Sequence, residues 1–262
     1  MSLDLAIRSF EILLALSLIV QTTEYLVLAR RQDVHDVWMW SVQKGDLQHS
    51  HRIVGLIFNV LYRDEIHILH LSLRLICAIS FIWGVTLVSS LFIFLSTIVL
   101  LIRWRGAFNG GSDFMTVVAV TGLVIAMVAT EFVDKERAWN VALWYVAIHS
   151  ITSYFMSGAV KLLNSHWRNG GALIYFLDRG LYGPLSEYSL FKRPVIAILA
   201  SWSFIIWEIL FPLVLFDEVI AVAFVITALG FHLLVFRFFG LNRFVWAWVV
   251  TFPAIIYCSN SL

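Results

Sequence analysis

Long apolar stretches recur along the whole of this chain, and they leave it few ways to fold. A stretch of about 20 apolar residues spans the hydrocarbon core of a bilayer as a helix, which satisfies its own backbone hydrogen bonds. Hydrophobic residues make up 61% of the sequence and charged residues only 13%, against about 25% in soluble domains. The sequence therefore predicts an all-α integral membrane protein.

We place a bundle of about eight transmembrane helices, at residues 10–28, 67–83, 87–102, 114–132, 138–162, 195–216, 219–236 and 244–257. Two connections between them are longer and more polar. Residues 29–66 mix Trp38 and Trp40 with charged side chains, a composition typical of helices that lie in the membrane interface. Residues 164–194 contain four glycines, and we expect them to cover the membrane surface as further interfacial helices. We expect residues 1–262 to form a single transmembrane domain without a separate soluble domain.

Lysine and arginine are distributed unevenly over the two sides of this predicted bundle. With eight spans, 14 of the 18 basic residues lie on one side, three lie on the other, and Arg74 lies within the membrane. By the positive-inside rule the basic side is cytoplasmic. The net charge of +1 gives no indication of a nucleic-acid partner. The sequence contains no phosphate-binding glycine loop and no CxxC or HExxH metal-binding motif. The HxH and HxxH spacings of His49, His51, His67 and His70 are only a weak indication of a metal site.

Ionisable residues line one face of the second stretch. Helical spacing places five polar or ionisable side chains within an arc of about 80°: Arg63, His67, His70, Arg74 and Cys77. Charged groups inside a membrane face the protein interior or a wet cavity, because lipid does not solvate them. One interpretation is that these side chains hold an anionic group. The other is that the histidines lie at headgroup level and Arg74 pairs with a structural carboxylate.

A second polar face belongs to the fifth stretch, where five side chains fall within an arc of about 120°: His149, Ser150, Ser153, Ser157 and Lys161. Serines in membrane helices often donate back to the carbonyl four residues earlier, so His149 and Lys161 are the informative members. A charged lysine costs roughly 2.5 to 3.5 kcal/mol at mid-depth in the membrane. Lys161 is therefore the best single indication of a functional site.

Two further ionisable residues interrupt apolar stretches, Glu208 in the sixth and His232 in the seventh. A carboxylate in this position must be protonated or paired, because an isolated buried ion is prohibitively costly. Its candidate partners are Arg74, His232 and Lys161. A structural ion pair and a proton relay have the same sequence signature.

The segment Asn109-Gly110-Gly111-Ser112-Asp113 joins the third and fourth stretches. One interpretation is a turn followed by a helix N-cap, since Ser and Asp accept hydrogen bonds from the free N–H groups of a helix start. The other is a loop facing a ligand, since glycines let backbone approach a bound group.

Several short motifs occur in the order and spacing of a known membrane family. They are Gly111-Ser112-Asp113, then Ser157-Gly158-Ala159-Val160-Lys161-Leu162 with Trp167 and Gly171-Ala172-Leu173, then Glu208 with Pro212, His232-Leu233 with Gly240-Leu241 and Phe244, and Phe252-Pro253. Together they resemble the horizontally transferred transmembrane (HTTM) domain family over residues 70–255. This family is the membrane portion shared by vitamin K-dependent γ-glutamyl carboxylases and their bacterial relatives.

The resemblance implies a chemistry. In the carboxylases a lysine is the base that deprotonates reduced vitamin K, and the resemblance implies this role for Lys161. A quinone or hydroquinone would be the cofactor, and Glu208 and His232 would tune or relay protons. Under this hypothesis the side chains that bind the cofactor are Arg74, His70, His149, Ser112, Asp113 and Trp167.

Family members differ in size and partners. Carboxylases carry a large soluble domain that holds the protein substrate, whereas this sequence ends at Leu262, soon after the last predicted span. Short bacterial members of the family, needed to mature a secreted peptide toxin, are closer in size to this sequence. The resemblance to them implies that this protein lies in a bacterial cytoplasmic membrane. The carboxylases act on the non-cytoplasmic side, so the resemblance and the positive-inside rule predict opposite orientations.

Three functions remain open from the sequence. The first is a membrane-embedded, carboxylase-like enzyme or enzyme subunit, in contact with membrane lipids and a soluble protein subunit. The second is a non-enzymatic accessory that helps to mature or export a partner peptide, in which Trp38, Trp40 and Trp167 matter more than Lys161. The third is a proton-coupled transporter, which is disfavoured because the spans show no inverted repeat.

Overall fold

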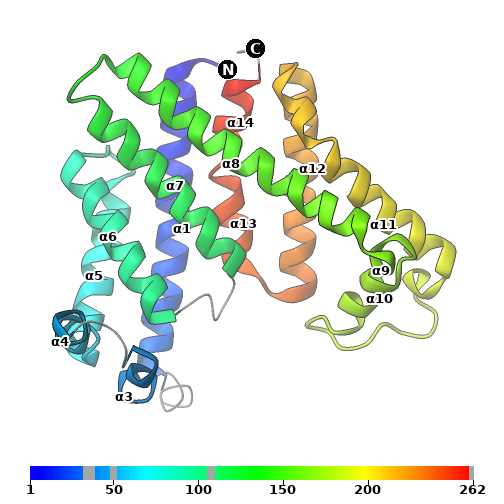
Figure 1. The fold of residues 1–262 in the computed structure, drawn as a ribbon, viewed down its shortest axis with the longest axis horizontal. Helices are drawn as coiled ribbons and strands as arrows, with labels where there is room; N and C mark the ends of the chain where they lie inside the picture. Colours follow the sequence, from blue (N-terminus) through cyan, green and yellow to red (C-terminus); the bar gives the residue numbers. More distant parts are fainter. Residues whose placement is uncertain (32–38, 48–51, 105–109, 260–262) are drawn as a thin grey trace.

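Every regular element of the protein is a helix within the residues that the computed structural model describes, which are 1–31, 39–47, 52–104 and 110–259 (Figure 1). The all-α prediction is confirmed for this part of the chain. In chain order the α-helices and 3-10 helices (η) are α1 (Leu3–Arg30), α3 (Trp40–Gln43), η1 (Lys44–Leu47), α4 (Arg52–Leu61), α5 (Asp64–Ser80), α6 (Leu87–Trp104), α7 (Gly110–Ala129), α8 (Lys135–Leu163), α9 (Ser165–Arg168), α10 (Gly171–Asp178), η2 (Leu190–Lys192), α11 (Pro194–Ile209), η3 (Phe211–Leu215), α12 (Glu218–Phe239), α13 (Asn242–Val249) and α14 (Phe252–Cys258).

The long helices begin where a side chain can cap them. Asp134 accepts a hydrogen bond from the backbone N–H of Arg137 at 2.9 Å and so starts α8. Asp217 accepts from the N–H groups of Val219 and Ile220 and starts α12. At the other end of α12, Gly240 adopts a φ of 69°, which favours glycine, and ends the helix.

Each of the eight predicted stretches coincides with helical structure, but two are broken. The sixth ends as an α-helix at Ile209 and continues as η3, which contains Pro212. The eighth is divided into α13 and α14, with Pro253 in the first turn of α14. Proline has no N–H to bond the preceding turn, so it forces such breaks.

Three helices in the described part of the chain are both long enough and apolar enough to cross a membrane: α6, α7 and α12. This is compatible with an integral membrane protein. The helices α1 and α8 are longer still, at 28 and 29 residues, but they carry more polar and charged side chains.

The helix α8 organises the bundle, because it packs against α7, α11 and α14, while α1 packs against α5, α13 and α14. Phe10 of α1 meets Trp139 of α8 edge to face, with ring centroids 6.2 Å apart, in the core between them. In Figure 1 the start of α1 and the end of α14 lie at the same end of the molecule, and α8 crosses it diagonally towards α11.

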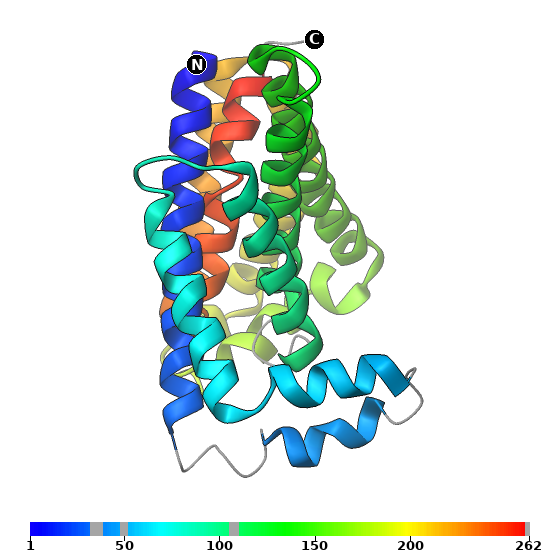
Figure 2. The same ribbon diagram turned by 90° about the vertical axis from the view of Figure 1, so that its left-hand side faces the viewer.

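Short helices occupy both of the long polar connections. In Figure 2, α3 and α4 lie across the bundle axis at the end opposite the N-terminus. The apolar side chains of Ile53, Leu56 and Ile57 on α4 are exposed, which fits a helix resting in the membrane interface. Trp38 lies outside the described residues. The second connection holds α9, α10 and η2.

Candidate ligand-binding cavity

A cavity of about 810 Å³ lies between α8, α11, α12, α13 and the connection that holds α9 and α10. Most of its wall consists of phenylalanine, tryptophan and leucine side chains. A small number of polar groups are placed within this apolar wall, an arrangement typical of small-molecule sites. Lys161, Trp167, Glu208 and His232, which the sequence places in four separate segments, all line it.

One face of α8 supplies several of the polar groups in the wall. Tyr154, Ser157 and Lys161 follow each other at helical spacing and all line the cavity. The face predicted from the sequence also includes His149 and Ser150, but these do not reach the cavity. The ring of His149 bonds the carbonyl of Tyr145 at 2.8 Å instead.

Lys161 and Glu208 form a close ion pair. The ammonium Nζ of Lys161 lies 2.6 Å and 2.7 Å from the two carboxylate oxygens of Glu208 and also donates to Ser157 Oγ at 2.6 Å. Ser157 donates in turn to Glu208 at 3.1 Å. The side chains are 16% and 3% exposed, so little water screens the pair. Of the three partners considered for Glu208, the structure selects Lys161.

The ion pair depends on a close approach of α8 and α11 at Gly158. A Cβ atom at this glycine would lie 2.8 Å from both the Cβ of Glu208 and the backbone N of Ile209. The absence of a side chain at Gly158 therefore brings Glu208 within reach of Lys161, one helical turn away.

Substituting Gly158 with alanine is expected to lower the free energy of unfolding by about 1–3 kcal/mol, because α8 and α11 must move apart to admit the methyl group. Thermal unfolding of the purified protein in detergent, followed by intrinsic fluorescence, measures the change. Gly230→Ala is the matched control, since no atom lies within 4 Å of the Cβ position there. Equal melting temperatures for Gly158→Ala and the wild type would contradict the close approach.

A second polar pair, Tyr154 and His232, lines the same cavity. The hydroxyl of Tyr154 lies 2.6 Å from Nε2 of His232, and both residues are buried. The imidazole stacks on Trp248 with centroids 5.2 Å apart. Tyr154 was not among the residues predicted from the sequence. Its signal was its position, seven residues before Lys161 and hence on the same face of α8.

Trp167 closes the cavity beside Lys161. Its ring centroid lies 5.3 Å from the lysine Nζ, within the range of a cation–π interaction. The carbonyl of Trp167 accepts a hydrogen bond from Ser201 of α11 at 2.5 Å. Gly170, at a φ of 77°, lets the chain pass directly over Ala197, where a Cβ would lie 2.7 Å from backbone. These contacts hold the second connection, residues 164–194 with α9, α10 and η2, against α11. It is called the connection below.

Arg74 and His70 lie in a different part of the protein, between α1, α5 and α6. Arg74 is fully buried and donates only to neutral oxygens, at 3.0–3.3 Å: those of Gln21, Thr22, Ile93, Ser96 and Thr97. His70 Nε2 lies 2.7 Å from Ser96 Oγ. No carboxylate of the described residues pairs with Arg74. This cage fastens three helices together, and none of its members lines the cavity.

Ser112 and Asp113 are buried in the first turn of α7, which begins at Gly110. They lie inside the helix rather than at its N-cap, and they do not line the cavity. An acidic side chain in a first turn is favoured by the helix dipole. Asn109 lies outside the described residues.

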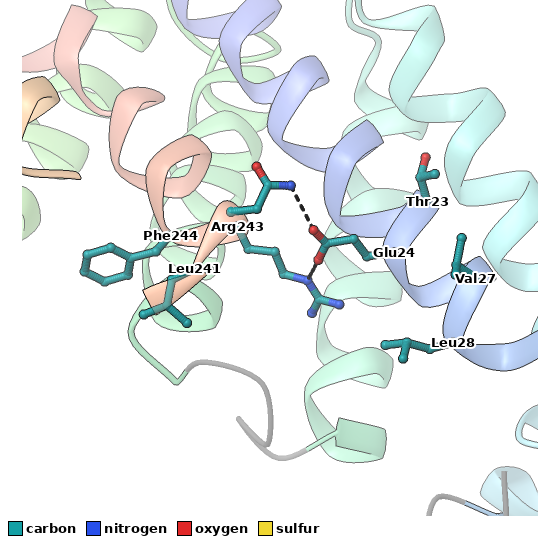
Figure 3. A pocket seen from close by; sticks show the side chains of 9 residues that line it. Thr23, Glu24, Val27, Leu28, Leu241, Arg243 and Phe244 are labelled. Atoms are coloured by element: carbon teal, nitrogen blue, oxygen red, sulfur yellow. Dashed lines mark hydrogen bonds and ion pairs between the residues drawn. The ribbon is translucent and has the colours of Figure 1, made fainter. Parts of the chain in front are cut away.

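A smaller cavity of about 390 Å³ lies between α1 and the turn from α12 to α13. Figure 3 shows Glu24 reaching from α1 to Arg243, with Phe244 on the other side of α13. Glu24 accepts from Arg243 Nε and, at 2.9 Å, from Asn242. The Arg243 guanidinium also lies 4.0 Å above the ring of Tyr25. This network fixes α13 on α1, and so it holds Phe244 in the wall of the larger cavity.

Comparisons with family models, with curated proteins and with solved structures found no significant match to this chain. The resemblance drawn from the motifs stays a prediction.

Proposed function

We propose that the cavity binds a quinone, a hydroquinone or another lipophilic cofactor, and that Lys161 is the base that deprotonates a hydroxyl group of its reduced form. The observation that carries this proposal is the Lys161–Glu208 ion pair set into an apolar, aromatic cavity. Flat aromatic side chains favour a planar ring by stacking and edge contacts. The buried ion pair supplies a charged point in the wall against which a polar head can be oriented.

The pair can exchange a proton without changing its net charge. Transfer from the Lys161 ammonium to Glu208 leaves a neutral amine beside a neutral carboxylic acid, and low polarity reduces the cost of this step because it disfavours the ionised pair. The amine can then accept a proton from a hydroxyl group of the ligand. The resulting oxyanion is stabilised by the ammonium that forms next to it. Glu208 thus acts as a proton reservoir for Lys161.

Tyr154 and His232 add a second group capable of proton exchange at the same cavity. Their 2.6 Å contact lets the imidazole orient the phenol, or the phenol donate to the imidazole. In the proposed function this pair positions the ligand or relays its proton, as predicted for His232. Arg74 and His70 lie outside the cavity and so take no part in binding.

We further propose that all eight predicted stretches cross the membrane, as a carboxylase-like HTTM domain in a bacterial cytoplasmic membrane. In this arrangement α11 with η3 makes one crossing, and α13 with α14 makes another. Support comes from the alternating directions of the long helices in Figure 1 and from the lengths of α1 and α8.

The accessory function in peptide maturation has less support. Of the tryptophans on which it depends, Trp40 is buried and its indole donates to Asn59 at 2.8 Å. Trp167 faces the cavity beside Lys161, and Trp38 lies outside the described residues. The connection does expose Tyr182 and Tyr188, which a partner peptide would contact.

The test of the proposed function is quinone binding in lipid nanodiscs. Mass spectrometry of extracted lipids should find a quinone bound to the wild type. Titration with a quinone should quench its tryptophan fluorescence. The double variant Lys161→Met/Glu208→Leu removes both charges together and should bind at least about tenfold more weakly, since a hydrogen bond to a charged group contributes about 1.5–3 kcal/mol.

The control is Lys192→Met/Glu187→Leu, which removes a lysine–glutamate contact of 2.7 Å at the surface and should bind as the wild type does. Undiminished quinone affinity in the Lys161 double variant would contradict the proposal. A peptide retained in place of a quinone would favour the accessory function.

A further inference from the structure

We propose that the ligand enters the cavity sideways from the bilayer, through a window between α11 and α12, and that it carries an apolar tail which remains in this window. The inference rests on the proposed function, because it concerns the same cavity. It adds a route of entry and a requirement for the shape of the ligand.

The helices α11 and α12 diverge with distance from η3. They are joined at η3 and diverge towards the end where the connection lies, as Figure 1 shows. Phe204 of α11 and Phe231 of α12 still meet, with ring centroids 5.3 Å apart.

Towards the connection, Ser203 of α11 and Leu234 of α12 both line the cavity and are both exposed. Phe176 of α10 and Phe191 of η2 also line the cavity and are exposed. We infer that these four side chains form the rim of the opening, between α11 and α12 and above the connection.

Contacts close two other boundaries of the cavity. Contact at Gly158 seals α8 against α11. His232 of α12 meets Phe244 and Trp248 of α13, with centroids 5.0 Å and 5.2 Å apart. The cavity is therefore closed between α8 and α11 and between α12 and α13.

The connection closes the base of the window. The N–H of Leu181 donates to the carbonyl of Phe238 near the end of α12 at 2.7 Å. Beside this bond the guanidinium of Arg237 lies 4.1 Å above the ring of Tyr182. An opening bounded by Phe204 and Phe231 on one side and by the connection on the other is a window rather than an open groove.

The surface around the window is suited to hydrocarbon. Leu199 of α11 is 62% exposed and Leu233 of α12 is 48% exposed, and α12 is one of the helices long and apolar enough to cross a membrane. The hydroxyl of Ser203 donates to the carbonyl of Leu199 at 2.8 Å, so it needs no water. A ligand that leaves this window meets lipid tails, and a polar, water-borne ligand would gain nothing there.

The polar groups lie inside the cavity, and the surface around the window is apolar. A ligand that fits both is an amphiphile, with its polar head at Lys161 and its apolar tail in the bilayer. A cavity of about 810 Å³ holds a ring system and the start of a tail. The remainder of a long tail would leave the cavity through the window.

Ser203→Phe and, one turn earlier, Ala200→Phe narrow the window from α11. Leu199→Phe is the matched control, because Leu199 is exposed on the same helix and does not line the cavity. Two probes separate entry of the tail from binding of the head: 2-methyl-1,4-naphthoquinone, and the same ring with a side chain of several isoprene units. Association rates are measured by stopped-flow fluorescence in nanodiscs.

Both window variants should slow association of the tailed quinone at least tenfold and should slow the tail-less quinone severalfold less, because only the tailed quinone leaves a chain in the window. The control should alter neither rate. Unchanged association of the tailed quinone in both window variants would overturn the inference while leaving the proposed function intact. Equal slowing of the two quinones would overturn the requirement for a tail. Binding of neither quinone to the wild type would overturn the proposed function and the inference with it.

Discussion

Glu208→Leu is expected to lower the free energy of unfolding by about 3–5 kcal/mol, because it leaves the Lys161 ammonium without its partner in an apolar cavity. The double variant Lys161→Met/Glu208→Leu removes the stranded charge as well and should recover most of the loss. Replacement of a buried ion pair by apolar side chains of similar volume is often neutral. Thermal or denaturant unfolding in detergent measures all three proteins.

The exposed contact between Lys192 and Glu187 is the matched control for this cycle. Its distance of 2.7 Å resembles that of the buried pair, but the glutamate side chain is 86% exposed. Solvent screening makes exposed pairs weak, so Glu187→Leu should leave the melting temperature unchanged. A double variant of Lys161 and Glu208 as unstable as Glu208→Leu alone would show that the two charges are not coupled.

The second large effect is expected at Arg74. Arg74→Met should lower the free energy of unfolding by about 3 kcal/mol or more. The substitution removes a fully buried cation with its five hydrogen bonds and leaves the side-chain Oε1 of Gln21 without this donor. Arg74→Lys should also be destabilising, since an ammonium has three donors and cannot match the planar fork of a guanidinium. Unfolding in detergent is again the measurement.

Arg30→Met is the control for Arg74, because Arg30 is exposed at the end of α1. It should change the free energy of unfolding by less than about 0.5 kcal/mol. Wild-type stability in Arg74→Lys would show that only the positive charge matters at this position. It would then revive an interpretation in which Arg74 holds an anionic group.

The helical elements follow from local properties that a sequence displays directly. Apolar stretches of sufficient length become helices because the backbone must satisfy its own hydrogen bonds in lipid. Pro212 and Pro253 lie within two of these stretches, and both helices break there. The sequence pattern predicts one continuous span over each proline. Helical spacing also placed Ser157 and Lys161 on one face of α8, as the structure confirms.

The grouping of ionisable residues could not be predicted in the same way. Glu208 had three candidate partners, and the choice of Lys161 depends on the close approach of α8 and α11 at Gly158. Arg74 was expected either to pair with a carboxylate or to hold an anion, and it is satisfied by neutral oxygens of α1 and α6 instead. Tyr154 was overlooked because a tyrosine in an apolar stretch has no distinctive signal until His232 is beside it.

The sequence alone determined that the chain is helical and apolar enough for a membrane, and that Lys161 and Glu208 need partners. The tertiary structure decided which partners they have, which residues share a cavity and where that cavity opens. The physical reason is that helix formation depends on neighbours within four residues, whereas ion pairs and cavities depend on the crossing of helices far apart in the chain. Gly158 illustrates the difference: one missing Cβ atom sets the distance between α8 and α11, and through it the site.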